Sequence, residues 1–307
     1  MIEIPEAFVR ITTDREGERG AQWLASLPEI VTELVERWGC TLDGPIMYGG
    51  VGVIVPVLKD QRPAVMKVSF PHPGNVAEPD AFAAWGGRGA VLLYERADEH
   101  FTMLLERART HTLVEVRDND EVVRIAGQLN HRLAVPAPST ALPRLRDQAP
   151  DWEHELRQDA ADLADPLPRH VVHAALATVR ELGSDQPELL VHGDFHQRNI
   201  LAGVREPWLA VDPKGYVGDP AYDGGTLLRT RAIALIEEDD LDKALIRSLD
   251  IFAEAAELDR ERVRRWAQLH AVQNAFWGRR HGFHLARVGP GLDRRTHLAD
   301  YLAQLFM

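Results

Sequence analysis

The spacing of apolar residues predicts a helix at the start of the chain. Residues 1–16 show no clear period, but apolar side chains then recur every three or four positions from Gly20 to Trp38, as they do on one face of a helix. Pro28 lacks a backbone N–H and is expected to split this helix in two, with Ser26 capping the second part. We expect the apolar face to pack on the sheet that follows.

Strand periodicity replaces helical periodicity after residue 40. Three apolar runs are separated by Gly49-Gly50 and by residues 60–62, which predicts an antiparallel meander. A hairpin with its tip at Asp98-Glu99 adds two more strands. The strands are expected at residues 41–48, 51–59, 63–70, 90–96 and 101–108.

The rest of the chain is mainly helical in pattern. Two short apolar runs, 189–191 and 208–211, interrupt it and predict two buried strands. No internal repeat or low-complexity segment is present. The helices are expected at residues 118–133, 152–163, 166–182, 220–236, 241–258, 260–280 and 296–306.

Each of the two short strands leads to a carboxylate. The first is followed by Asp194, with Asn199 five residues later, and the second by Asp212. In phosphoryl transfer one carboxylate orients the attacking hydroxyl, while an Asn and a second Asp hold Mg²⁺ against the phosphates. Asp194 is therefore the candidate catalytic residue, and Asn199 and Asp212 are the candidate metal ligands. The alternative is a polar loop with solvated acids.

Composition narrows the class of protein. The chain has 307 residues, of which 45% are hydrophobic and 27% charged, as in an ordinary globular protein. A net charge of −12 argues against nucleic acid and anionic membrane surfaces as partners. No run approaches the roughly 18 apolar residues of a membrane span. Cys40 is the only cysteine, which excludes an internal disulfide and is compatible with the cytoplasm.

The segment from His192 to Leu201 resembles the catalytic loop of the aminoglycoside phosphotransferase family, which are kinase-fold enzymes that phosphorylate small molecules. Asp212 and the segment 218–223 resemble that family's metal-binding aspartate and the stretch after it. Gly193 and His196 stand where protein kinases have Arg and Lys, which favours a small-molecule kinase. Residues 85–91, 104–107, 206–210 and 273–274 resemble the streptomycin 6-kinase (aminoglycoside/hydroxyurea resistance kinase) branch.

The resemblance implies an α+β, two-lobed, protein-kinase-like fold. Residues 1–107 would form an N-lobe with an antiparallel sheet, and residues 108–307 a mainly helical C-lobe. ATP, or another nucleoside triphosphate, would bind between the lobes together with Mg²⁺. The acceptor would be a small hydroxylated molecule. Neither the oligomeric state nor the acceptor hydroxyl is readable from the sequence.

The same resemblance assigns nucleotide-binding residues in the N-lobe. Lys67 lies among apolar residues on a predicted strand, where an unpaired ammonium is costly; its partners would be the ATP phosphates and a helix glutamate. Glu78 is the first choice for that glutamate and Asp80 the second. Gly50 falls where a phosphate-covering loop belongs. The backbone around Glu106 and Ala108 would hydrogen-bond the adenine.

Several residues near the loop keep two interpretations. His192 is expected to orient the loop backbone rather than to exchange protons. His196 and Arg198 would either approach the transferring phosphoryl group or face solvent. Lys214 would either meet phosphate charge or form a salt bridge with Asp219 or Asp223, two acids that are expected to be structural.

The acceptor is expected to lie against the helices after residue 223. Glu237 and Glu238 belong to an acidic run that would bind a cationic aminoglycoside, although a solvated loop with a helix cap is the favoured interpretation. Asn274 and Trp277 are expected on one side of a helix. Arg279-Arg280 follow and would disfavour a guanidino-sugar acceptor if they lined its pocket.

Three functional hypotheses remain. The leading one is ATP-dependent phosphorylation of a hydroxyl on a streptomycin-type aminoglycoside, an antibiotic-resistance activity. The second is a kinase for another hydroxylated metabolite, such as a sugar, an amino sugar or a hydroxyurea-like compound. The third is a non-catalytic nucleotide-binding protein, against which the complete set of Lys67, Asp194, Asn199 and Asp212 argues.

Overall fold

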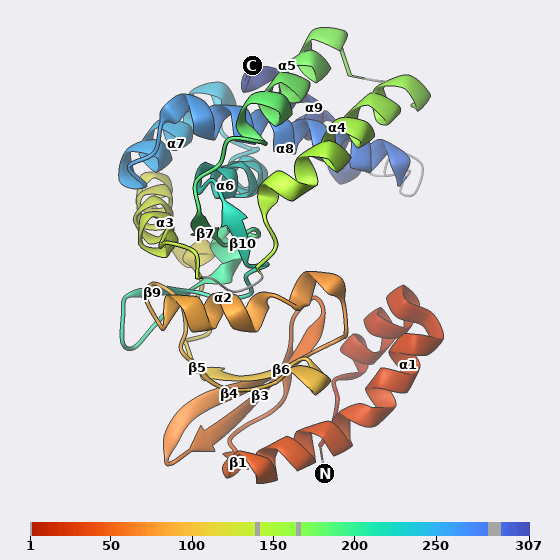
Figure 1. Ribbon diagram of the computed structural model, residues 1–307, viewed down its shortest axis with the longest axis vertical. Coiled ribbons are helices and arrows are strands. Elements are labelled where there is room, and N and C mark those ends of the chain that lie inside the picture. The colour runs from red at the N-terminus through yellow and green to blue at the C-terminus, as the bar shows by residue number, and fades with distance from the viewer. Residues whose placement is uncertain (1, 139–141, 164–166, 282–289) are drawn as a thin grey trace. The chain divides into compact units, whose positions relative to one another are not determined.

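The computed structural model describes residues 2–138, 142–163, 167–281 and 290–307. They form two compact units, which Figure 1 shows in ribbon form. The first contains the chain up to residue 109 and the segment 203–207, and the second contains residues 110–202 and 208–307. Segment 203–207 joins the first unit because Arg205 lies 2.9 Å from the Glu106 carboxylate and 2.8 Å from the Ala90 carbonyl oxygen.

The first unit is built on the predicted antiparallel sheet, in the order β1-β3-β4-β6-β5, with β2 also paired to β3. The expected strand at 41–48 is instead two short strands, because Gly44-Pro45 interrupts it and proline cannot donate to a sheet ladder. The strands are β1 (Cys40–Leu42), β2 (Met47–Tyr48), β3 (Gly52–Lys59), β4 (Arg62–Ser69), β5 (Leu93–Ala97) and β6 (Thr102–Glu106).

The N-terminal helix differs from the prediction. Helix α1 (Glu6–Arg37) includes most of the segment expected to be irregular, and its break lies at Gly17 (φ 61°, ψ −137°), not at Pro28. Glycine adopts positive φ without a side-chain clash, whereas Pro28 is accommodated inside the helix. Ser26 is therefore not the helix cap that was predicted, and its hydroxyl donates to the Trp23 carbonyl oxygen at 2.8 Å.

Helix α1 covers one face of the sheet, as predicted. Its buried side chains, among them Trp23, Leu27 and Leu34, share one apolar cluster with residues of β3 and β4 such as Val55 and Met66. Successive side chains of a strand point to opposite faces, so Lys67 points away from this cluster. The remaining helical pieces of the unit are η1 (Pro73–Asn75), α2 (Glu78–Trp85) and η2 (Asp98–His100).

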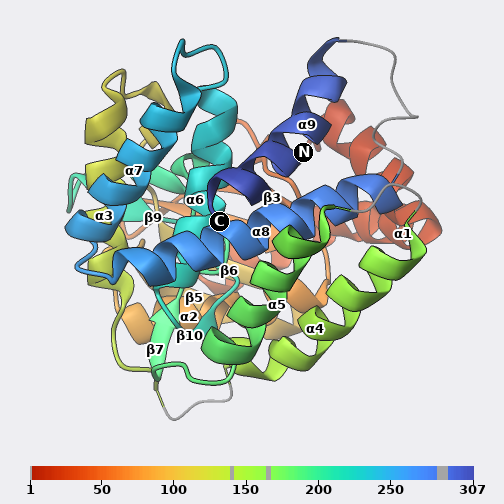
Figure 2. The same cartoon turned by 90° about the horizontal axis from the view of Figure 1, so that it is seen from above.

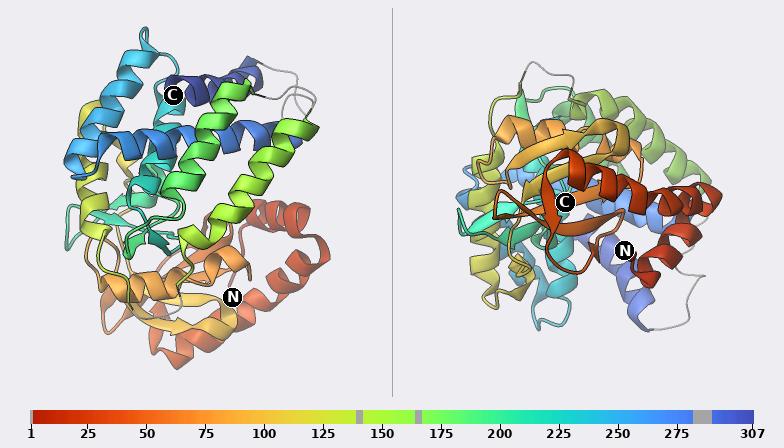
Figure 3. Two further views of the ribbon diagram at one scale, coloured as in Figure 1. Left: turned by 45° about the horizontal axis from the view of Figure 1, so that its top comes forward. Right: turned by 90° about the horizontal axis from the view of Figure 1, so that it is seen from below.

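The second unit is mainly helical. Figures 2 and 3 show its long helix α8 beside α5, α6 and α9. Helix α4 begins at Leu145, seven residues before the prediction, and carries Pro150 inside it. Residue 166, the predicted start of the next helix, lies outside the described residues. The helices are η3 (Leu113–Glu115), α3 (Asn119–Leu133), α4 (Leu145–Asp162), α5 (Arg169–Leu182), η4 (Gln197–Asn199), α6 (Ala221–Ala234), α7 (Leu241–Ala255), α8 (Arg260–Arg280) and α9 (Pro290–Leu305).

Two small antiparallel strand pairs carry the loops of the predicted site. Strand β7 (Leu189–Val191) pairs with β10 (Tyr216–Gly218), and β8 (Ile200–Ala202) pairs with β9 (Trp208–Ala210). The two predicted strands at 189–191 and 208–211 are thus present, each with a partner of its own. None of the described helices combines the length and apolar character needed to cross a membrane.

Candidate active site

The loop after β7 is shaped by a glycine and a buried histidine. Gly193 has φ +81°, and a Cβ there would lie 2.5 Å from the Tyr216 ring, so only glycine fits. Burial lowers the pKa of His192 to about 4, which keeps the imidazole neutral. Its Nε2 lies 2.9 Å from the Val211 carbonyl oxygen, and its Nδ1 lies 3.3 Å from the Asp194 backbone nitrogen. His192 therefore donates through Nε2, accepts through Nδ1 and orients the loop backbone, as predicted.

Asp223, on helix α6, holds the same loop from the other side. Its two carboxylate oxygens accept hydrogen bonds from the backbone N–H groups of His192 at 2.9 Å and Gly193 at 2.8 Å. Burial raises the pKa of Asp223 to about 7, although the two backbone hydrogen bonds oppose that rise. The sequence indicated a structural role for this acid, but not that it positions the residue next to Asp194.

Asp219 is structural as well. Its carboxylate accepts from the Ala221 backbone N–H and from the Trp266 indole N–H, and it pairs with Arg262 at 2.7 Å. Neither salt bridge considered for Lys214 is present in the described part of the chain, because other groups occupy both carboxylates. The phosphate-binding interpretation of Lys214 thus remains a prediction.

The three residues predicted to act on phosphate and metal lie on adjoining loops. The Asn199 amide nitrogen donates to the Asp194 carbonyl oxygen at 3.0 Å and lies 3.5 Å from its carboxylate. The Val211 N–H donates to the Asn199 carbonyl oxygen at 2.9 Å, which ties the loop to the residue before Asp212. Asp194 keeps 33% of its side chain exposed, so it remains accessible to a substrate.

These donors fit Mg²⁺. With its amide nitrogen used by Asp194, Asn199 offers its amide oxygen, and Asp212 offers a carboxylate. No group of three or more His, Cys, Asp or Glu side chains that could hold a metal occurs among the described residues. Mg²⁺ needs no such group, because it keeps several waters and is bound through one or two protein ligands together with substrate phosphates.

In the first unit, Lys67 forms the predicted ion pair. Its Nζ lies 2.5 Å from Glu78 Oε1, and only 8% and 1% of the two residues are exposed. Asp80, the second choice, pairs instead with Arg96 at 2.6 Å. Glu78 rather than Asp80 is the partner of Lys67 because Glu78 begins helix α2 and is buried, whereas Asp80 lies nearer the surface.

The other positions predicted to bind the nucleotide are Gly50, Glu106 and Ala108, and their neighbours are as follows. Gly50 lies between β2 and β3, and its carbonyl oxygen accepts a hydrogen bond from Arg15. Glu106 ends β6, and its carboxylate is held by Arg205 and by the Leu92 backbone N–H. The Glu106 N–H donates to the Leu92 carbonyl oxygen at 2.8 Å, and the contact of this backbone with a nucleotide stays a prediction. Ala108 follows β6 in the irregular stretch before residue 110.

Comparison with known proteins now identifies the family. The model of the aminoglycoside/hydroxyurea antibiotic resistance kinases matches residues 37–282. The chain belongs to this family of kinases. A streptomycin 6-kinase of Streptomyces griseus is 36% identical over 279 residues, covering 90% of this chain and 91% of that protein. A hydroxyurea phosphotransferase of Kitasatospora aureofaciens is 35% identical over 282 residues, covering 90% and 80%.

Solved structures agree on the fold of this kinase. An aminoglycoside phosphotransferase in ternary complex with ADP and hygromycin B has a TM-score of 0.55 at 15% identity, covering 89% of this chain and 97% of that one. A choline/ethanolamine kinase family protein of Mesorhizobium loti has a TM-score of 0.58 at 14% identity, covering 90% and 94%. The predicted protein-kinase-like α+β fold is confirmed. Family membership makes the chain a small-molecule phosphotransferase that uses a nucleotide and a hydroxyl acceptor, so the non-catalytic hypothesis is set aside.

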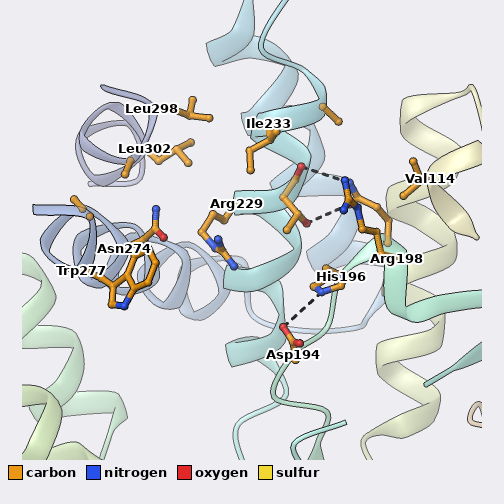
Figure 4. A pocket seen from close by; sticks show the side chains of 16 residues that line it. Val114, Asp194, His196, Arg198, Arg229, Ile233, Asn274, Trp277, Leu298 and Leu302 are labelled. Atoms are coloured by element: carbon orange, nitrogen blue, oxygen red, sulfur yellow. Dashed lines mark hydrogen bonds and ion pairs between the residues drawn. The ribbon is translucent and has the colours of Figure 1, made fainter. Parts of the chain in front are cut away.

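Two neighbouring cavities of the kinase lie in the second unit. The first, of about 520 Å³, contains Asp194, His196 and Arg198; the second, of about 480 Å³, contains residues of α4, α6 and α8. Asn274 and Trp277 line both. Figure 4 shows these two side chains on one side of the first cavity, with His196 and Asp194 on the other. The expectation that Asn274 and Trp277 share one side of their helix is confirmed.

The charged residues expected near the acceptor lie elsewhere or are already paired. Glu237 and Glu238 are exposed in the turn between α6 and α7 and are not among the lining residues of either cavity. The Asp240 side chain of the same acidic run caps α7. Arg279 pairs with Asp300 at 2.6 Å, and Arg280 lines the second cavity but pairs with Asp159 at 2.8 Å.

Proposed function

We propose that this kinase transfers the terminal phosphoryl group of ATP, with Mg²⁺, to a hydroxyl of a small molecule. The juxtaposition of Asp194 and Asn199, tied through Val211 to Asp212, carries the proposal. Asp194 orients the acceptor hydroxyl and accepts its proton as the bond to phosphorus forms. Asn199 and Asp212 hold Mg²⁺, which supplies positive charge to the phosphates. The enzyme is assigned to the cytoplasm, where ATP is available.

The nucleotide is bound by positions of the first unit and by Lys214. Lys67 contacts its phosphates, and Glu78 fixes the ammonium in place. The backbone at Gly50 and the Lys214 side chain meet further phosphate charge. The backbone around Glu106 and Ala108 hydrogen-bonds the adenine edge. All of these contacts position and neutralise charge, which is the main requirement of phosphoryl transfer.

A streptomycin-type aminoglycoside is the first candidate acceptor, supported by relatives named streptomycin 6-kinase. The lining of the first cavity favours a second candidate, a neutral or anionic hydroxylated metabolite; the second cavity holds acids of its own, Asp151 and Glu155. In the first cavity Asp194 is the single acidic residue among the described lining residues, beside Arg198 and Arg229. Because Asp194 is reserved for the hydroxyl, this cavity offers a cationic acceptor no other carboxylate.

The test is phosphate transfer from Mg-ATP by the purified full chain. Streptomycin, hydroxyurea, glucose, glucosamine and glucuronate serve as acceptors, and the Asp194→Asn variant serves as the control for background hydrolysis. Transfer by the wild type that disappears in Asp194→Asn supports the proposal. Equal transfer by both proteins contradicts the role of Asp194. Transfer to streptomycin alone selects the first acceptor class.

A further inference from the structure

Arg229 is a cation on the wall of both cavities. It lies on α6, is half-buried, and lines the first cavity with Asp194 and the second with His270. Figure 4 shows its side chain pointing between Asn274 and the Asp194 side of the first cavity. Burial lowers the pKa of the Arg229 guanidinium, and Asp194 is the one charge that opposes this effect. Within the described chain, Arg229 has neither a hydrogen bond nor an ion pair.

The other arginines of this region differ from Arg229. Arg280 lines the second cavity but is neutralised by Asp159, and Arg279 by Asp300. Arg231, two residues further along α6 and therefore on the opposite side of the helix, donates to the Asn119 side chain at 2.6 Å. Removing a guanidinium from water without a carboxylate is costly. A buried guanidinium without a carboxylate partner, on the wall of a cavity, is typical of a ligand-binding site.

His270 provides an independent observation in the second cavity. Its side chain lies on α8, the residue is 9% exposed, and its Nδ1 lies 3.4 Å from the Thr226 hydroxyl. Its Nε2 is buried and has no hydrogen-bond partner. Burial lowers the pKa of His270 to about 3, and the nearby Arg229 charge adds to this, so the ring is neutral. A buried polar atom of this kind requires a partner, which a ligand can supply.

We propose that Arg229 and His270 bind an oxyanionic substituent of the acceptor, such as a carboxylate, while the acceptor hydroxyl lies at Asp194. The guanidinium presents a planar fork of N–H donors that matches a carboxylate. The neutral His270 donates to the same substituent when Nε2 carries its proton. The inference rests on the phosphotransferase role of Asp194 and concerns the substituent of the acceptor that lies at Arg229. Asp151 and Glu155 also line the second cavity, so the inference predicts the charge of that substituent and not of the whole acceptor.

Equilibrium binding to the full chain tests this without requiring turnover. Glucuronate, glucose and streptomycin are titrated calorimetrically, at constant ionic strength, into the wild type, Arg229→Gln, Arg229→Lys and Arg280→Gln. We expect the wild type to bind glucuronate at least about tenfold more tightly than glucose, as a charged hydrogen bond would provide. That preference should vanish in Arg229→Gln, persist in part in Arg229→Lys and persist fully in Arg280→Gln, whose guanidinium is already paired.

Two further measurements separate the alternatives. Arg229→Gln should bind Mg-ATP as tightly as the wild type does. If it binds Mg-ATP more weakly and keeps the glucuronate preference, the guanidinium contacts the transferring phosphoryl group. That result overturns the proposal. Arg229→Gln should also melt no lower than the wild type, and a lower Tm would indicate a structural role instead. Equal binding of glucuronate and glucose by the wild type refutes the proposal, even if phosphate transfer from ATP is observed. Failure of transfer to every acceptor, with the glucuronate preference intact, would contradict only the proposed function.

Discussion

The buried pair of Lys67 and Glu78 yields a quantitative prediction. With 8% and 1% of these residues exposed and 2.5 Å between Nζ and Oε1, each charge stabilises the other with little competition from water. Lys67→Met removes a cation that lies 2.5 Å from a carboxylate whose residue is 1% exposed. Breaking one side of such a pair typically destabilises a protein by about 3–5 kcal/mol. We expect a loss of that size, together with loss of Mg-ATP binding.

The double variant Lys67→Met/Glu78→Leu should recover much of this stability. Replacing both partners by apolar side chains removes both buried charges, and such replacements are often neutral in their effect on stability. A double-mutant cycle should therefore give a coupling free energy of about 3 kcal/mol or more. Mg-ATP binding should not recover, because the ammonium is still missing.

Arg37 and Glu99 provide a matched control in the same unit. Their side chains are 48% and 54% exposed and lie 2.7 Å apart, so the same cycle should give a much smaller coupling free energy, because water screens exposed charges. The assay is denaturant unfolding, followed by hydrogen exchange of β4 amides to report on the first unit. A Lys67–Glu78 coupling as small as that of the control would refute the argument, since it would mean that water reaches the pair.

Three further predictions concern the second unit. Asp194→Asn should retain Mg-ATP binding but lose at least about 10²-fold in transfer rate, and an unchanged single-turnover rate would remove its catalytic role. Asp212→Asn should weaken nucleotide binding only when Mg²⁺ is present; titrations with and without the metal check this. Because burial raises the pKa of Asp223 from 3.8 to about 7, its contribution to folding is complete below pH about 4 and is lost as the pH rises to about 7. Asp223→Asn should lose that part of the pH dependence of Tm, and identical wild-type and variant profiles would contradict it.

The local sequence pattern was sufficient to predict the sheet of the first unit, most of the helices and the loop from His192 to Asn199. Alternation along residues 63–70 identified β4 and placed Lys67 on it, because period-two burial is a property of one strand and its two faces. The spacing of Asp194 and Asn199 predicted their proximity, since a loop of five residues cannot separate them widely. Pattern misplaced the break in α1, because the helix accommodates a proline but not the backbone conformation of Gly17.

What the sequence by itself determined, then, was the family of the kinase and the residues proposed for its chemistry: those proposed to position a hydroxyl, a metal and phosphates lie close together along the chain or share a recognisable motif. Only the tertiary structure decided what surrounds that chemistry. Asp223 reaches the loop from about thirty residues away, and Arg229 and His270 line one cavity because α6 packs on α8. The same packing neutralised Arg279 and Arg280 and left Glu237 and Glu238 outside the cavities. The physical reason is that helical periodicity shows which side of a helix is buried, but not which distant side chain lies against it.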